Sequence, residues 1–122
     1  MTSLAGRRIL VIEDEMLIAL MIQSMLEELG YQVAASAPTV ADALAIIETD
    51  SQDIDAATLD INLGGEHCNR VADALEAHGI PFIITTGYDD PKLFDFPGRP
   101  VVHKPFVPEQ LKQALQSLKP SR

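Results

Sequence analysis

The sequence is short of cysteine and of basic residues, and each shortage excludes a class of protein. Cys68 is the only cysteine, so no intrachain disulfide can form, and an incidental small residue is a better interpretation of it than a catalytic thiol. Nine Lys and Arg stand against 18 Asp and Glu, which gives a formal net charge of −9. Because phosphate backbones repel such a chain, we expect no nucleic acid among its partners.

Long hydrophobic runs and a targeting segment are also missing. The longest apolar stretch, around Met16 to Met25, is interrupted by Gln23 and Ser24, and no stretch is long enough for a bilayer. The first eight residues lack the order of a signal peptide. We therefore expect a cytoplasmic protein without a membrane partner. With 122 residues, 47% of them hydrophobic, we expect one folded domain over 1–122 with a core at about 7–119.

Five short apolar or β-branched runs are typical of strands. The run at 8–12 is continuous and predicts a strand buried on both faces. A weaker run at 31–36 suits an edge, and further runs lie at 56–59, 81–85 and 100–103. Between them, apolar residues recur at helical spacing. The predicted inner faces are Leu17, Leu20, Met21, Met25 and Leu29; Val40, Ala43, Leu44 and Ile47; Val71, Ala74, Leu75 and His78; and Leu111, Ala114, Leu115 and Leu118.

Several residues mark where these helices begin and end. Thr39 is a predicted cap with an acid three residues later, and Pro108 suits the first turn of the last helix. Gly30 and Gly79 end two others. The link 87–99 holds two prolines and two glycines, so we expect a loop or a short distorted helix there.

The alternation of strands and helices predicts an α/β fold with a parallel sheet covered on both faces. Right-handed crossovers leave few topologies, and one is a doubly wound five-stranded sheet with strand order 2-1-3-4-5. In that order, the carboxyl ends of four adjacent strands carry the unusual residues of the chain. These are Glu13-Asp14, Asp60, Thr85-Thr86 and His103-Lys104.

Carboxylates that converge without a cation repel one another, and a divalent ion removes that conflict. Oxygen ligands with a phosphate suit Mg²⁺, so Glu13, Asp14 and Asp60 are candidate metal ligands, with the backbone carbonyl of Asn62 as another. A carboxylate is also a nucleophile toward phosphoryl groups. We therefore expect Asp60 to accept a phosphoryl group. The charge of that group would be offset by Mg²⁺, the Lys104 ammonium and the Thr86 hydroxyl.

These segments resemble a response-regulator receiver domain of bacterial two-component signalling, from about Arg8 to Leu118. The matching pieces are Ile9 to Glu15, Leu59 to Leu63, Ile84 to Gly87 and Lys104 to Phe106. The resemblance implies the flavodoxin-like fold, with Asp60 as phosphoacceptor from a histidine kinase or phosphotransfer protein. It also implies that Glu13 and Asp14 bind Mg²⁺, that Thr86 and Lys104 contact the phosphoryl group, and that the Lys104–Pro105 bond is cis.

Two features depart from the usual family pattern. Val101 stands where most members have an aromatic residue, and the fourth helix is predicted to be short or absent. In both features the chain resembles a subgroup of receiver domains that has a Phe-Ala-Thr-Gly motif, although Ile84 and Thr85 stand in place of the Phe and Ala. That resemblance makes Tyr88 the candidate switch aromatic.

We expect a stand-alone receiver that signals to an unknown downstream protein through a phosphorylation-dependent change of residues 86–99, and that is not an enzyme. Two alternatives remain open. A Mg²⁺-dependent phosphatase of the haloacid-dehalogenase type also uses an Asp nucleophile, but its second Asp is replaced here by Asn62. The other alternative is a receiver fold used only for binding. The presence of the acceptor, the acidic pair, the Thr and the Lys counts against it.

Overall fold

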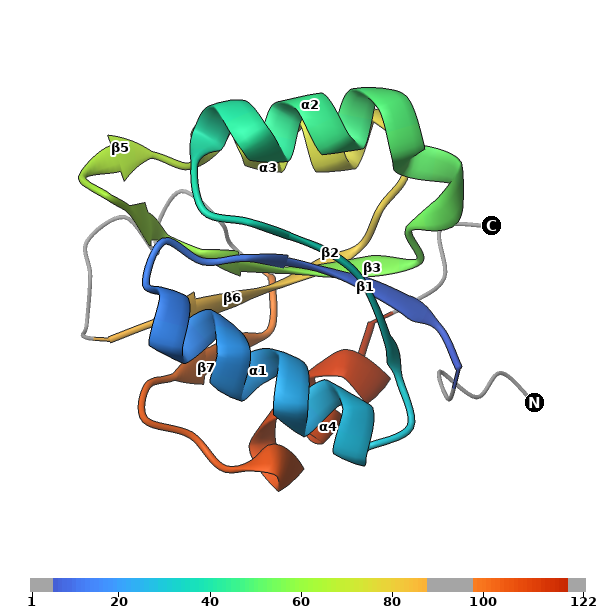
Figure 1. Cartoon of the computed structure of the whole chain (residues 1–122), viewed down its shortest axis with the longest axis vertical. Helices are drawn as coiled ribbons and strands as arrows, with labels where there is room; N and C mark the ends of the chain where they lie inside the picture. Colours follow the sequence, from blue (N-terminus) through green and yellow to red (C-terminus); the bar gives the residue numbers. More distant parts are fainter. Residues whose placement is uncertain (1–5, 88–97, 119–122) are drawn as a thin grey trace.

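A five-stranded parallel sheet forms the centre of the molecule (Figure 1). A computed structural model describes residues 6–87 and 98–118. The strands lie in the order β2-β1-β3-β6-β7, and each adjacent pair is parallel. This is the predicted order 2-1-3-4-5, and the predicted edge position of the second strand is confirmed. The strand bounds are β1 Arg8–Ile12, β2 Gln32–Ala37, β3 Ala56–Asp60, β6 Phe82–Thr86 and β7 Val101–His103.

Four α-helices cover the two faces of this sheet. Figure 1 shows α2 (Val40–Asp50) and α3 (Asn69–Ala77) on one face, and α1 (Met16–Glu28) and α4 (Pro108–Gln116) on the other. A short 3-10 helix, η1 (Ser51–Asp53), follows α2. Within the part of the chain that the structure describes, no helix is both long and apolar enough to cross a bilayer.

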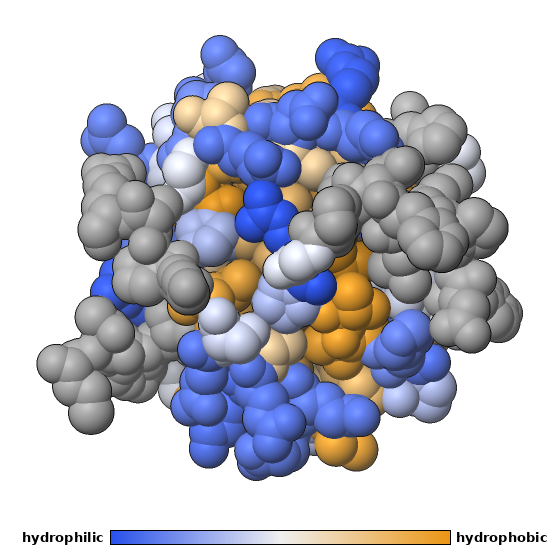
Figure 2. Space-filling model, turned by 180° about the vertical axis from the view of Figure 1, so that it is seen from behind, coloured by the Kyte–Doolittle hydropathy of each residue, from blue (hydrophilic) through white to orange (hydrophobic). Residues whose placement is uncertain are grey.

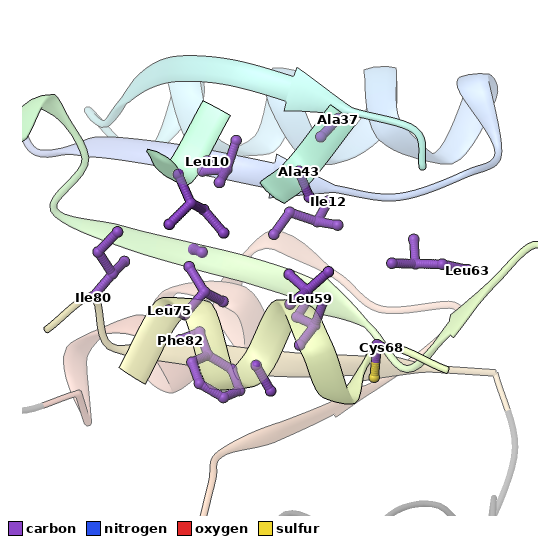
Figure 3. Close-up of a cluster of buried hydrophobic side chains, with 14 of the residues drawn as sticks. Leu10, Ile12, Ala37, Ala43, Leu59, Leu63, Cys68, Leu75, Ile80 and Phe82 are labelled. Carbon is purple, nitrogen blue, oxygen red and sulfur yellow. The ribbon is translucent and has the colours of Figure 1, made fainter. Parts of the chain in front are cut away.

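The buried side chains form two clusters, one on each side of the sheet, because β1, β3 and β6 are covered on both faces. Successive residues of a strand point to opposite faces, so each strand contributes to both clusters. Figure 3 shows the cluster under α2 and α3, where Leu10 and Leu59 of the sheet meet Leu75 of α3. Cys68 is buried in this cluster, in keeping with a packing role. The second cluster lies under α1 and α4 and contains Ile9, Val11, Ala56, Ile83 and Val102.

The predicted helix ends agree with the structure. The Thr39 side chain accepts a hydrogen bond from the Asp42 N–H at 3.0 Å, and Pro108 occupies the first turn of α4. Gly30, after α1, has a φ of 94°, a left-handed conformation that favours glycine. The link predicted to be a loop or short helix falls on residues 88–97, outside the described residues.

The predicted inner face of α1 is wrong in part. The helix buries Ala19, Ile22 and Leu26, whereas Leu17 is 76% exposed and Leu20 and Met21 are each about half exposed. The reason is that α1 is apolar nearly all round at its start, so hydrophobic spacing fits more than one face. Of the predicted set, Met25 and Leu29 do pack partly against the core. The inner faces of α2, α3 and α4 are largely as predicted, with the buried residues Val40, Ala43, Ile47, Val71, Leu75, Leu111 and Leu115.

A small hairpin after β3 was not predicted. Strands β4 (Asn62–Leu63) and β5 (Glu66–His67) pair antiparallel around Gly64 and Gly65, whose φ angles are 60° and 84°. Two consecutive positive φ angles are those of a tight hairpin turn, which explains the double glycine. The hairpin lies at the end of the sheet to which the parallel strands point (Figure 1).

The surface on the far side of the molecule is mixed. Figure 2 shows hydrophilic residues at the top and bottom of that face, with hydrophobic surface between them.

The exposed large apolar residues of the described chain gather mainly on α1. Those that are more than half exposed are Met16, Leu17, Leu20 and Met21 on α1, and Val107 before α4.

Candidate functional site

The carboxyl ends of four parallel strands meet at one edge of the sheet and bring the predicted site residues together. Glu13 follows β1, Asp60 ends β3, Thr86 ends β6 and Lys104 follows β7. The register sets them side by side, because Ile12 pairs with Leu59 and Asp60 pairs with Thr85. Doubly wound proteins bind their ligands at the carboxyl ends of their parallel strands.

Three carboxylates lie within reach of a single ion. One oxygen from each of Glu13, Asp14 and Asp60 lies within 4.8 Å of the others. Glu13 is 1% exposed and Asp60 is 4% exposed, whereas Asp14 is partly open to solvent. Burying charge is costly unless it is compensated, so two buried acids here require a cation beside them.

Lys104 supplies that cation in the described structure. Its Nζ atom lies 2.6 Å from Glu13 Oε1 and 3.2 Å from Asp60 Oδ2. The Lys104 side chain is 15% exposed, so water screens these contacts weakly. The ammonium therefore joins an acid of β1 to the acid of β3 from its position after β7.

The pKa values of both buried acids are raised. Burial raises the pKa of Glu13 to about 7, against the opposing effect of Lys104, and a hydrogen bond with Asp60 adds to the rise. Burial also raises the pKa of Asp60, although the Asn62 N–H, Glu13 and Lys104 oppose that rise. Burial lowers the pKa of Lys104, but its contacts with Glu13 and Asp60 outweigh this and leave it raised. Two adjacent buried acids cannot both ionise easily beside one ammonium.

The hairpin after β3 holds the other side of the site. The Gly64 N–H donates to Asp14 Oδ2 at 3.1 Å, and the Asn62 N–H donates to Asp60 Oδ1 at 3.0 Å. The Asn62 side chain in turn accepts a hydrogen bond from the Gly65 N–H at 3.2 Å. The hairpin thus orients two of the three acids. Sequence reasoning missed the Gly64 contact, although the double glycine was a signal that the backbone turns tightly there.

The remaining predicted site residues fall as follows. Thr86 is 2% exposed, and its carbonyl accepts a hydrogen bond from the Lys104 N–H at 2.7 Å. The Lys104–Pro105 peptide bond is cis, the form that the sequence resemblance implied. Asn62 lies beside the acids, with its backbone next to Asp60. Tyr88, the candidate switch aromatic, lies outside the described residues.

A pocket of about 550 Å³ opens beside the cluster. Asp14, Asp60, Thr86 and Lys104 line its polar part. Its apolar part is formed by α1 and the segment after Lys104, through Ile18, Met21, Ile22, Met25 and Phe106. The acidic cluster is therefore reached across the apolar side of α1, a feature that the sequence did not reveal.

The donor set fits a small hard cation. Carboxylate oxygens, a backbone carbonyl and water are the ligands that Mg²⁺ prefers, and Glu13, Asp14 and Asp60 offer the first kind. The predicted contribution of the Asn62 carbonyl stays a prediction. The buried acid pair that now needs the Lys104 ammonium is the same pair that such an ion would neutralise. The arrangement can therefore place a carboxylate nucleophile, a divalent ion and an ammonium around one phosphoryl group.

Comparison with known families gives one match over most of the chain. The model of the response regulator receiver domain matches residues 9–116. No protein with a curated description matches the chain.

Several solved structures are similar to this chain. SdrG from Sphingomonas melonis Fr1 is 44% identical, with a TM-score of 0.78, over 92% of this chain and 95% of that one. PhyR from Brucella abortus is 33% identical, with a TM-score of 0.75, over 90% of this chain. A PhyR mutant from Bartonella quintana, described as an anti-anti-sigma factor, is 31% identical, with a TM-score of 0.75, over 90% of this chain. The chain spans about half the length of each PhyR, 46% and 47% respectively.

Proposed function

The chain belongs to the response regulator receiver domain family, and on that premise we propose that it accepts a phosphoryl group on Asp60 from a histidine kinase or phosphotransfer protein. The proposal also includes a requirement for Mg²⁺, a cytoplasmic bacterial setting and a role in signalling rather than in metabolism. The observation that supports it best is the buried pair Glu13–Asp60, held by Lys104 at the mouth of a pocket.

The proposed reaction forms a bond between an Asp60 carboxylate oxygen and phosphorus while the bond from phosphorus to the donor nitrogen breaks. The nitrogen of the donor histidine keeps the electron pair of that bond. Asp60 is suited to this step because the Asn62 N–H fixes its Oδ1 atom and it lines the open pocket. Bound Mg²⁺ supplies neutralisation of charge on the phosphoryl oxygens.

Lys104 has two roles in this proposal. Before Mg²⁺ binds, its ammonium compensates Glu13 and Asp60. With Mg²⁺ held by Glu13, Asp14 and Asp60, the Lys104 ammonium would be available to a phosphoryl oxygen, and Thr86 at the neighbouring strand end would offer its hydroxyl to another. The ion would then supply the positive charge that compensates the buried acids.

Incubation with acetyl phosphate and Mg²⁺, followed by intact mass measurement, tests the assignment. We expect the wild-type protein to gain one phosphoryl group and Asp60→Asn to gain none. The label should disappear in alkaline hydroxylamine, as an acyl phosphate does. Equal labelling of Asp60→Asn, or no labelling of wild-type protein in the presence of Mg²⁺, would refute the proposal.

Two rival functions are less well supported. A phosphatase of the haloacid-dehalogenase type needs a second acid two residues after the nucleophile, where this chain has Asn62. Sustained turnover of a small phosphoester by the purified protein would favour that rival. A binding-only receiver would show no measurable Mg²⁺ binding by calorimetry, despite its three neighbouring carboxylates.

For the downstream partner we propose a protein of a sigma-factor control circuit. The support is the 31% identity with the receiver half of a protein described as an anti-anti-sigma factor. In this proposal phosphorylation draws Thr86 toward Asp60 and changes the segment 86–99, with Tyr88 as the switch aromatic. Affinity capture with protein carrying beryllium fluoride, against Asp60→Asn as control, should retain such a partner only on the loaded protein.

A further inference from the structure

Two buried threonines on one face of the sheet have hydroxyls that the proposed reaction does not use. Thr58 of β3 and Thr85 of β6 are each 1% exposed. In the described part of the chain, neither Oγ1 atom has a hydrogen-bond partner. An unsatisfied buried hydroxyl costs free energy, so one that lies near a site of changing charge is an acceptor available to that site.

Thr85 lies on the same face of the sheet as the acidic cluster. Ala56 and Ile83 both belong to the cluster under α1 and α4, and alternation places Asp60 and Thr85 on that same face. Asp60 and Thr85 are register partners on adjacent strands. Thr58 shares the face but pairs with Ile83, one row deeper in the sheet.

The Lys104 side chain reaches its partners across the end of β6. Lys104 follows β7, whereas Glu13 follows β1 and Asp60 ends β3, on the far side of β6. Alternation assigns Lys104 to the same face as Thr85, because Val102 and Ile83 both belong to the cluster under α1 and α4. Thr85 is the last described residue of β6 with a side chain on that face, because the next position there is Gly87.

The ammonium needs a new acceptor when its present ones are taken. An ammonium has three donors, and in the described structure that of Lys104 donates to Asp60 Oδ2 and forms an ion pair with Glu13 Oε1. Both atoms belong to the acids that fit a divalent ion. An ion held there would compete with Lys104 for these carboxylates, in a buried setting where an unpaired charge is costly.

We propose that Thr85 Oγ1 accepts a hydrogen bond from the Lys104 ammonium in the Mg²⁺-bound protein and so holds Lys104 against the incoming phosphoryl group. Thr85 is thereby a positioning residue, distinct from Thr86, whose hydroxyl faces the phosphoryl group itself. The inference rests on the proposed function, because it assigns a second acceptor to the lysine of that same site.

Isosteric substitution tests this role. At saturating Mg²⁺, we expect Thr85→Val to be phosphorylated by acetyl phosphate about tenfold more slowly than wild type, the effect of losing one hydrogen bond to a charged group. Thr85→Ser keeps the hydroxyl and should recover most of the rate. Thr58→Val is the matched control, since it removes an equally buried hydroxyl from the same face, and should react at the wild-type rate. Mg²⁺ affinity should stay within about twofold in all three variants.

Two outcomes of the rate experiment overturn the proposal. One is a wild-type rate for Thr85→Val at saturating Mg²⁺. The other is a Thr85→Ser rate as slow as that of Thr85→Val, because the loss would then come from packing rather than from the hydroxyl.

A second measurement does not depend on phosphorylation and separates this proposal from the proposed function. In Mg²⁺-bound protein at low temperature, the ¹H–¹⁵N signal of the Lys104 ammonium should shift and exchange faster with water in Thr85→Val, but not in Thr58→Val. An unchanged Lys104 signal in Thr85→Val overturns the role of Thr85. Failure of wild-type protein to take any phosphate refutes the proposed function instead, and the ammonium signal still decides the contact.

Discussion

At the scale of single residues, Lys104 determines the state of the site. Its ammonium contacts an acid of β1 and an acid of β3, so three strand ends are joined by one side chain. Removing one partner of such a buried group leaves an uncompensated charge, which is more costly than the pair itself is favourable. The two buried acids therefore need a cation beside them, and in the described structure Lys104 is that cation.

The raised pKa of Glu13 predicts how stability varies with pH in the absence of divalent ions. Burial raises this pKa from 4.5 to about 7, so between these values the folded state holds a proton that the unfolded state has lost. The free energy of unfolding should then fall as pH rises, by roughly 2 kcal/mol between pH 5.5 and 7, at 1.36 kcal/mol per pKa unit. Urea denaturation in EDTA at a series of pH values measures this.

Glu13→Gln provides the control, because its amide resembles the protonated acid and does not titrate. The decline between pH 5.5 and 7 should be much smaller in this variant, while the contributions of other groups, including the three histidines, remain. Parallel stability profiles for the two proteins would contradict the prediction. Saturating Mg²⁺ should also flatten the wild-type profile, because the ion stabilises the ionised acids.

At the scale of elements, α1 serves two purposes with different faces. Ala19, Ile22 and Leu26 pack against the sheet, while Met16, Leu17, Leu20 and Met21 remain exposed. Its spacing does not distinguish these faces, because apolar residues occupy consecutive positions from Met16 to Ile22. Tertiary packing decides the matter, because Ala19, Ile22 and Leu26 share a buried cluster with Leu111 and Leu115 of α4.

Alanine substitutions on the two faces of α1 should differ clearly in their effect on stability. Ile22→Ala removes a fully buried side chain and should lower the free energy of unfolding by about 2–4 kcal/mol. Leu20→Ala removes a side chain that is 52% exposed and should cost less than about 1 kcal/mol. Equal losses in urea denaturation at fixed pH would mean that Leu20 is buried after all.

At the scale of the whole molecule, the exposed side of α1 and the acidic cluster form one continuous surface. Met21 and Met25 line the same pocket as Asp60 and Lys104. In the proposed function, a phosphodonor that brings a histidine to Asp60 would lie against this apolar edge. We expect a helix of the kinase or phosphotransfer protein to pack there, with its apolar side on Leu17, Leu20 and Met21.

A charge on this edge should separate the two routes of phosphorylation. Leu20→Glu should slow phosphotransfer from the cognate kinase by about tenfold or more, because a charge is buried against an apolar partner. The rate with acetyl phosphate should remain near that of wild type, since the small donor needs no such surface. Phosphoprotein gels for the kinase reaction and intact mass for acetyl phosphate measure the two rates.

Ala41→Glu is the charge-matched control, placed at an exposed position of α2 on the opposite face of the sheet. It should leave both rates unchanged. If Leu20→Glu slows both routes equally, the substitution disturbs the site itself. If it slows neither, the kinase approaches Asp60 from another side.

The sequence by itself determined the sheet and the set of residues at its edge. Buried β-branched runs alternate with helical spacing, and only a few right-handed topologies accommodate that alternation. The resemblance to receiver domains favoured the order 2-1-3-4-5 among them. Asp60, Glu13 and Lys104 come directly at or after strand ends, which fixed their common edge.

Only the tertiary structure decided the distances and the faces. The contact of Lys104 with both acids, the Gly64 N–H on Asp14 and the pairing of Asp60 with Thr85 join residues separated along the chain. The exposed side of α1 likewise depends on packing against the sheet and α4. Local sequence encodes the period of an element, but the neighbours that cover one face and leave another open are set by the packing of the whole chain.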